Sequence, residues 1–312
     1  MPPIFIIYMD TIMKKIIFPL GNDYLDNINI INNTSIGQFY FGVADEQLSG
    51  CSVSHHYSPT GAVKFADVLD LMSLISDKNK KISIAVNIHF YDKYLVKRII
   101  SMLKKLPLEF VDYLIIGNLE VYKEVKDAFP DIKCAASSLF GIKNIESAMF
   151  FGEMGFNKII FPRNVELDEI AYICKNLDNS IEKEAFIFGG GCVYCEGTCS
   201  LPHVFVNHKS SPQFDICTSS PIPLCSFPAE LDFKDNFRTI KHLDFGFRGC
   251  GLCYANILSE MGISSLKITG RTMSAKKKWN LIRNMERYFN LNPDKCKESN
   301  NYCLYEKVKY DF

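Results

Sequence analysis

Short apolar runs alternate along the chain with stretches whose apolar residues recur at helical spacing. The runs are rich in β-branched and aromatic residues and are bounded by turn residues, which is typical of buried strands in a parallel sheet. Eight runs are predicted as strands: Ile16–Leu20, Gln38–Gly42, Ile82–Asn87, Tyr113–Gly117, Lys133–Ser137, Lys158–Pro162, Ala185–Gly189 and Ser265–Thr269. Amphipathic helices are expected between them, including Phe65–Ile75, Lys93–Leu106, Ile145–Met154 and Leu167–Cys174.

Eight strands separated by helices fit a closed (β/α)8 barrel, a TIM-barrel-like single domain, better than an open sheet. The barrel is predicted to span residues 14–290, with 1–13 as an N-terminal appendage of no assigned role and 291–312 as a C-terminal tail. Residues 190–264 form one long insertion between the seventh and eighth strands. Because the loops after the strands build the catalytic face of such barrels, the insertion is expected to lie over the active site.

The charge balance gives little reason to expect a polyanionic partner. The 35 basic and 35 acidic residues cancel, so no global field attracts nucleic acid or an anionic membrane. A basic stretch late in the chain is either a local binding patch or a solvated helix face. Its members are Lys267, Arg271, Lys276, Lys277, Lys278, Arg283 and Arg287.

The N-terminal apolar run gives no sign of membrane insertion or export. Residues 3–9 are too few to span a bilayer, and no basic region precedes them as a signal peptide requires. We therefore expect a cytoplasmic protein without a membrane partner.

Seven of the twelve cysteines lie in or beside the insertion. They are Cys192, Cys195, Cys199, Cys217, Cys225, Cys250 and Cys253. Cytosolic thiols are kept reduced, so this clustering favours metal ligation over disulfides. Two Cys-x-x-Cys pairs would suit a structural zinc site, whereas a 4Fe-4S cluster tolerates irregular spacing and accommodates the surplus cysteines. The spacing leaves both metals open.

Two motifs resemble a known family. The run from Glu184 to Cys199, Glu-Ala-Phe-Ile-Phe-Gly-Gly-Gly-Cys-Val-Tyr-Cys-Glu-Gly-Thr-Cys, resembles the signature of the collagenase-like peptidase family U32. The run Leu266–Arg271, Leu-Lys-Ile-Thr-Gly-Arg, is similar to that family's Lys-Ile-Glu-Gly-Arg ending. Ala136–Ser138 and the segment that begins at Phe161 agree more loosely, so the resemblance covers residues 14–290.

The resemblance implies an iron-sulfur enzyme, because members of this family include oxygen-independent hydroxylases that hold a 4Fe-4S cluster. These act on ubiquinone precursors or on bases of transfer and ribosomal RNA, several with prephenate as the hydroxyl source, and some work in pairs. The implied ligands are Cys192, Cys199, Cys217 and Cys253, with Cys250 as an alternative fourth. Cys195 and Cys225 depart from the family pattern and leave the ligand set open.

Arg163 and Arg271 are predicted at the mouths of the sixth and eighth strands. There a guanidinium fork could hold a carboxylate such as that of prephenate. The alternative is an ion pair that closes the barrel, with Glu166 or Glu184 as the partner.

His55 and His56 follow the second strand, on the expected catalytic face. They are either acid–base groups or structural loop residues. In the same loop Cys51 is a reserve ligand, and His203 lies either beside the cluster or in a surface loop.

The leading hypothesis is therefore an iron-sulfur oxidoreductase that hydroxylates a small molecule, an RNA base or a peptide with a carboxylate donor. The alternatives are a collagenase-like peptidase, and a non-catalytic subunit, stapled by its metal, that forms a heterodimer with another family member. No Gly-x-Ser-x-Gly elbow or His-Glu-x-x-His helix supports hydrolysis. The neutral charge balance gives RNA little support as the acceptor.

Overall fold

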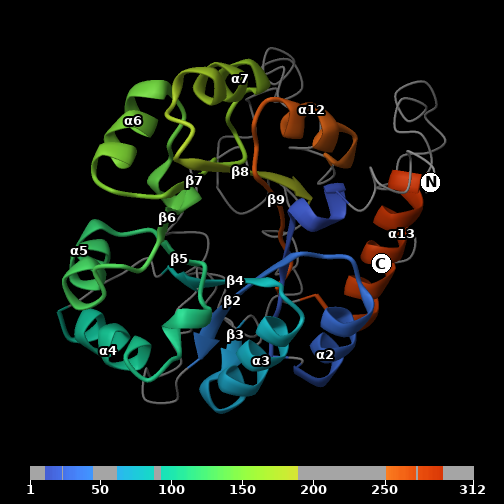
Figure 1. Ribbon diagram of the computed structural model, residues 1–312, viewed down its shortest axis with the longest axis horizontal. Helices are drawn as coiled ribbons and strands as arrows, with labels where there is room; N and C mark the ends of the chain where they lie inside the picture. Colours follow the sequence, from blue (N-terminus) through green and yellow to red (C-terminus); the bar gives the residue numbers. More distant parts are fainter. Residues whose placement is uncertain are drawn as a thin grey trace, which may run out of the picture.

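Eight parallel strands close into a barrel in the computed structural model, which describes residues 11–22, 24–44, 62–87, 93–188, 251–271 and 273–290 (Figure 1). Closure is complete because β1 pairs with β2 on one side and with β9 on the other. In barrel order the strands are β1 (Ile16–Pro19), β2 (Gln38–Ala44), β4 (Lys81–Val86), β5 (Tyr113–Ile116), β6 (Cys134–Ala136), β7 (Lys158–Ile160), β8 (Glu182–Phe188) and β9 (Ser265–Ile268). The predicted (β/α)8 barrel is confirmed.

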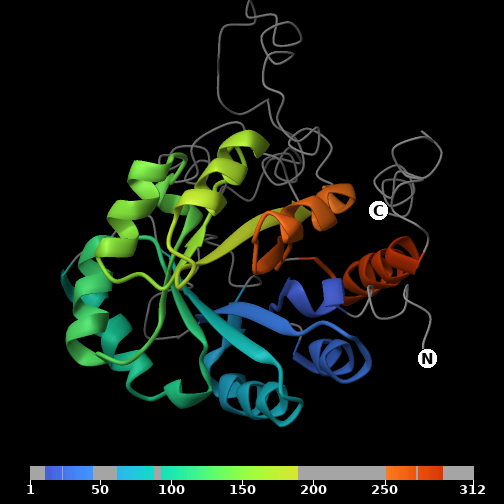
Figure 2. The same cartoon turned by 45° about the horizontal axis from the view of Figure 1, so that its top comes forward.

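Helices surround the barrel, so that the strands form the inner layer of the fold (Figure 2). They are α2 (Tyr24–Asn33), α3 (Phe65–Asp77), α4 (Lys93–Leu103), α5 (Leu119–Ala128), α6 (Ile145–Glu153), α7 (Leu167–Asn176), α12 (Ala255–Glu260) and α13 (Ala275–Asn290). The four helices named from the sequence are present, with ends that differ by no more than a few residues. A membrane span would need a helix longer and more apolar than any in these ranges.

Two strands depart from the sequence prediction. β3 (Ala62–Lys64) was not predicted and pairs with β2 outside the closed ring. β8 begins at Glu182, before the predicted start at Ala185, because its first residues are charged and were not read as strand. Two of these charged residues, Glu182 and Glu184, form ion pairs with Lys158 on the neighbouring strand.

Side-chain caps explain where two of the helices begin. The Asn118 side chain accepts hydrogen bonds from the backbone N–H groups of Glu120 and Val121 at the start of α5. Asn144 accepts one from the N–H of Ser147 at the start of α6. These bonds satisfy amide groups that the first turn of a helix leaves without partners.

The barrel has an apolar core on each side of its strands. The larger one fills the space between the strands and the helices. The smaller one lies inside the barrel and consists of Ile17, Tyr40, Ala85, Tyr113, Ile115, Ala135, Ile160 and Phe186. Of the described barrel strands, only β9 adds no residue to it, and β9 instead buries the polar side chains of Ser265 and Lys267. The barrel interior is therefore polar near β9.

The predicted appendage and insertion each include residues that belong to the barrel. Ile12 and Met13, at the end of the predicted appendage, are buried in the larger core. Within the predicted insertion, α12 is the helix that leads into β9, and its Ala255 and Leu258 are buried. Residues 189–250 and the predicted tail lie outside the described residues.

Cys134 and Cys174 are buried, and burial raises the pKa of each thiol to about 11. Only on the order of a thousandth of either thiol should be ionised at about pH 8, and the thiolate is the reactive form. We expect neither to react with iodoacetamide in the folded protein and both to react in urea, as measured by mass spectrometry of the tryptic peptides. Rapid labelling of Cys134 in the folded protein would contradict its burial.

Candidate active site

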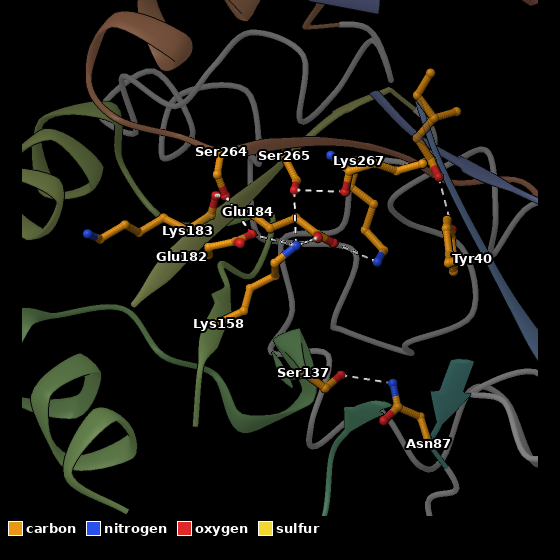
Figure 3. A network of polar contacts seen from close by, with 12 residues as sticks. Tyr40, Asn87, Ser137, Lys158, Glu182, Lys183, Glu184, Ser264, Ser265 and Lys267 are labelled. Carbon is orange, nitrogen blue, oxygen red and sulfur yellow. Dashed lines mark hydrogen bonds and ion pairs between the residues drawn. The ribbon is translucent and has the colours of Figure 1, made fainter. Parts of the chain in front are cut away.

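A chain of buried charges crosses three neighbouring strands inside the barrel (Figure 3). Oε1 of Glu184, on β8, lies 2.7 Å from Nζ of Lys267 on β9, and its Oε2 lies 3.6 Å from Nζ of Lys158 on β7. Nζ of Lys158 also lies 3.1 Å from Oε2 of Glu182 at the start of β8. Two ammonium groups and two carboxylates therefore balance one another.

Hydrogen bonds extend this network to β2. Nζ of Lys158 donates to Oγ of Ser265 at 3.1 Å, and the Ser265 hydroxyl donates to Oε1 of Gln38 at 3.2 Å. Lys158 thus contacts β8 and β9 at once, although its own strand does not pair with β9. These bonds supply partners for polar groups that would otherwise be costly to bury.

Aromatic rings provide further partners for both lysines. Nζ of Lys267 lies 4.0 Å from the centre of the Tyr40 ring, and Nζ of Lys158 lies 4.2 Å from that of Tyr113. Such contacts stabilise a cation where water is excluded. Burial lowers the pKa of Lys267, and the attraction of Glu184 opposes that effect. Burial also raises the pKa of the Tyr113 hydroxyl, and so does its hydrogen bond to Glu182.

Arg271 adds a cation that this network does not neutralise. It follows β9 at the carboxyl end of the barrel and is 8% exposed. Among the described residues it has no hydrogen bond or ion pair, and its buried Nη1 lacks an acceptor. Its nearest aromatic contact is the ring of Tyr40, 5.9 Å from the guanidinium carbon. Burial lowers the pKa of Arg271, yet arginine stays charged in proteins. A buried guanidinium without an acceptor is suited to an anion.

Each of the two arginines predicted for the site lies near one aromatic ring of the barrel interior. Arg163, after β7, places its guanidinium carbon 5.0 Å from the centre of the Phe186 ring. Lys267 lies within 6 Å of both rings, 4.0 Å from Tyr40 and 5.9 Å from Phe186. The arginines therefore flank the aromatic end of the barrel interior. The carboxylate-binding role of Arg163 and Arg271 stays a prediction.

The alternative of an arginine–carboxylate pair is wrong for Glu184, whose partners are the two lysines. Glu166 is exposed and precedes α7, and within the described ranges it forms no ion pair with Arg271. Neither of these two carboxylates therefore neutralises the charge of Arg271.

A second polar group lies at the same end of the barrel. The Asn87 amide donates to Oγ of Ser137 at 2.9 Å, and both side chains are buried (Figure 3). Oδ1 of Asn87 has no hydrogen-bond partner. Gly117 makes room for it, since a Cβ there would lie 3.0 Å from that oxygen and 2.7 Å from Cδ1 of Leu139. Asn87 therefore has a buried, unpaired acceptor at this end of the barrel.

Most of the predicted metal ligands lie outside the described residues. These are Cys192, Cys195, Cys199, Cys217, Cys225, Cys250 and the reserve ligand Cys51. The predicted acid–base residues His55 and His56, and His203, also lie outside the described residues. The backbone of Cys253 is described, in the short 3-10 helix at Leu252–Tyr254. Within the described ranges no three His, Cys, Asp or Glu residues are grouped as metal ligands.

The two ends of the cysteine-rich segment meet at the carboxyl end of β8. The chain leaves the described part after Phe188 and re-enters it at Gly251, whose N–H donates to the carbonyl of Ile187 at 2.7 Å. In the sequence, Cys192 lies four residues after Phe188, and Cys250 directly precedes Gly251. Both ends of the segment are thus fixed at the end of the barrel that holds Arg271.

A cavity of about 560 Å³ opens at the opposite end of the barrel. Lys81, Asp112, Tyr113 and Glu182, at the starts of their strands, are among its lining residues. Catalytic groups of such barrels lie at the carboxyl ends of the strands. We therefore place the candidate active site at the end that holds Arg271 and Asn87.

Sequence reasoning missed Lys158, Lys267, Tyr40 and Asn87 as parts of the site. The available signal was a lysine within each of two otherwise apolar strands, Lys158-Ile-Ile and Ser-Leu-Lys267-Ile. A lysine is rarely buried without a partner, so these positions could have been paired with Glu184.

Comparisons with known proteins agree with the resemblance seen in the sequence. The model of Peptidase family U32 matches residues 40–309. The chain is 28% identical over 210 residues to a 23S rRNA 5-hydroxycytidine synthase of Escherichia coli, covering 66% of this chain and 30% of that protein. It is 25% identical over 273 residues to tRNA hydroxylation protein P of Helicobacter pylori, covering 84% of this chain and 61% of that protein. A solved U32 peptidase structure aligns with a TM-score of 0.45 and 11% identity over 64% of this chain and 82% of that chain. The chain spans less than two thirds of the length of either curated relative.

Removing one partner of the buried pair should cost far more than removing both. Lys267→Met leaves Glu184 with only the longer contact to Lys158, and we expect a loss of about 3–5 kcal/mol in the free energy of unfolding. The double variant Lys267→Met/Glu184→Leu should recover most of that loss, because Lys158 keeps Glu182. Urea unfolding of the three proteins measures the coupling. Lys123→Ala, which removes an exposed ion pair with Asp127, is the control and should leave stability unchanged within error. Additive effects of the two buried substitutions would contradict the coupling.

Proposed function

Because the chain belongs to peptidase family U32, and curated relatives within it are named for hydroxylation of transfer and ribosomal RNA, we propose that it is an RNA-base hydroxylase. In this proposal the barrel binds a small carboxylate that donates the hydroxyl group, and an RNA base is the acceptor. The reaction uses no O2.

The buried, uncompensated charge of Arg271 carries the proposal. A carboxylate such as that of prephenate would give its guanidinium two parallel N–H···O bonds, which is the geometry that arginine favours. Such a ligand would also supply the acceptor that Nη1 lacks. Arg163 would approach the same ligand from the neighbouring Phe186 ring.

Aromatic and amide groups at the end of the barrel that holds Arg271 suit a planar acceptor. The rings of Tyr40 and Phe186 lie inside the barrel, and Asn87 has a buried amide oxygen without a hydrogen-bond partner at the same end. An amide can recognise the hydrogen-bonding edge of a base, and an aromatic ring can stack on its face. A base in a helix would first have to leave its stack, which favours a single-stranded or flipped-out nucleotide.

A 4Fe-4S cluster is proposed on Cys192, Cys199, Cys217 and Cys253. The donor set fits, because four thiolates are the usual ligands of such a cluster and both ends of the cysteine-rich segment meet beside β8. When bound, the cluster would supply electron transfer or an iron site for an oxygen donor. Arg271 would hold the donor at that same end of the barrel.

Peptide hydrolysis receives no support from the described cysteines. Cys134 and Cys174 are buried with raised pKa values, whereas a nucleophilic cysteine needs a lowered pKa and access to the substrate. Both residues belong to the apolar core.

We expect Arg271→Lys to weaken prephenate binding about tenfold or more, because a charged hydrogen bond contributes about 1.5–3 kcal/mol and the fork is lost. Isothermal titration of the metal-loaded protein with prephenate measures the change. Arg283→Lys, an exposed position on α13, should bind as the unaltered protein does. Equal affinity for the Arg271 variant would overturn the donor site.

We expect Cys192→Ser and Cys199→Ser each to lose the cluster, whereas Cys296→Ser and Cys303→Ser should retain it. Anaerobic purification followed by iron, sulfide and zinc analysis should give about four irons and four sulfides per chain in the unaltered protein. Stoichiometric zinc without a visible chromophore would replace the redox proposal with a structural zinc site.

A further inference from the structure

The outer face of α4 and the turn that follows it are basic. Between Lys93 and Pro107 the sequence has five basic residues and no acidic one. All five are exposed, and none takes part in the ion pairs found among the described residues. They are Lys93, Lys97, Arg98, Lys104 and Lys105. The buried residues Val96, Ile99, Met102 and Leu103 occupy the opposite face, which packs on the barrel. The basic face therefore points away from the core.

An aromatic side chain stands at the start of this face. Tyr94 is 80% exposed, the largest exposed fraction of any large apolar or aromatic side chain in the described part of the chain. Tyr94, Lys97, Arg98 and Ser101 follow the i, i+3, i+4, i+7 spacing that brings side chains onto one side of a helix. A ring with its face open to solvent beside two cations combines base stacking with phosphate attraction.

The connectivity places this surface next to the candidate active site. α4 follows β4, and Asn87 directly follows the last residue of that strand. A helix that follows a barrel strand begins at the carboxyl end of that strand, so Lys93 and Tyr94 lie toward the mouth. α4 lies on the outside of the barrel beside α5 (Figure 1). A chain bound along α4 could thus lead to the mouth.

The late basic stretch noted in the sequence is a weaker candidate for a polyanion. Three of its seven members, Lys267, Arg271 and Lys278, are buried in the barrel or under α13. Its exposed remainder includes Lys276, Arg283 and Arg287, and Glu286 lies among them, close enough for Arg283 to lower its pKa against the raising effect of burial. α4 has no such acidic residue.

From these observations we infer that the exposed face of α4 (Lys93, Tyr94, Lys97 and Arg98), with Lys104 in the turn after it, binds the RNA substrate, with Tyr94 stacking on a base and the cations contacting phosphates. The inference rests on the proposed function for its choice of RNA among polyanions. It places recognition of the RNA backbone on α4, separate from the chemistry at Arg271.

The test measures binding of unfractionated tRNA, labelled at one end with a fluorophore, to the full chain. Fluorescence anisotropy gives the binding constant at each of several salt concentrations. Lys97→Ala/Arg98→Ala should reduce the slope of log K against log salt by about 1.4–1.8, because each lost phosphate contact is worth about 0.7–0.9. Tyr94→Ala should weaken binding about fivefold to 150-fold with little change in slope, since stacking on one base is worth about 1–3 kcal/mol. All three residues are exposed, and alanine favours a helix.

The matched control is Lys276→Ala/Arg283→Ala, which removes the same charge from α13 and should leave the slope unchanged. Loss of slope in this control with none in the α4 variants would overturn the inference, and so would equal loss in both. Binding to anionic lipid vesicles but not to tRNA would overturn it as well.

Hydroxylation of the tRNA distinguishes this inference from the proposed function. If tRNA binds through α4 and no hydroxylated base forms with prephenate, the α4 surface stands and the proposed activity fails. If hydroxylation proceeds with the same KM for tRNA in the α4 variants, the activity stands and the α4 surface fails.

Discussion

The carboxylate of Glu184 lies between two lysine ammonium groups inside a barrel whose interior also has an apolar core. Lys158, Glu184 and Lys267 stand on three consecutive strands of the barrel, so each ion pair also joins two neighbouring strands. A slip of one residue in the pairing of β8 would turn Glu184 toward the helices and leave both lysines without a carboxylate. The network therefore restricts the register in the part of the barrel that leads into the cysteine-rich segment.

The same network determines which charge reaches the mouth of the barrel. Glu182 and Glu184 offset Lys158 and Lys267, so these four charges cancel within the network. Arg271 lies beyond them, next to the Tyr40 ring that also contacts Lys267. Without Glu184, Lys267 would add a second positive charge beneath Arg271, and an anion would have two competing positions. With Glu184 present, the charge of Lys267 is offset, and in the proposed function a small carboxylate would bind at Arg271.

The sequence predicted the barrel well because strand and helix periodicity are local. Each strand except β3 could be found from its apolar run, whereas β3 has three residues and pairs on one side alone. The start of β8 was missed because Glu182, Lys183 and Glu184 look like a solvated turn until their partners are known. Those partners, Lys158 and Lys267, are distant in the chain, and no local pattern reveals that they are buried. Arg271 was found through its motif, but only the three-dimensional structure shows that it has no carboxylate partner among the described residues.

The two proposed binding sites, the exposed face of α4 and the buried Arg271, are both positively charged. The whole chain has equal numbers of acidic and basic residues, so attraction of a polyanion must come from an uneven distribution of charge. A patch such as α4 acts within about one Debye length, about 8 Å at physiological salt, and can hold an RNA backbone only by direct contact. Arg271, in contrast, is buried, and in the proposed function it binds a small carboxylate. Under the two proposals, the difference in exposure between α4 and Arg271 would separate the two anions: the RNA would bind on the outside of the barrel and the carboxylate donor inside it.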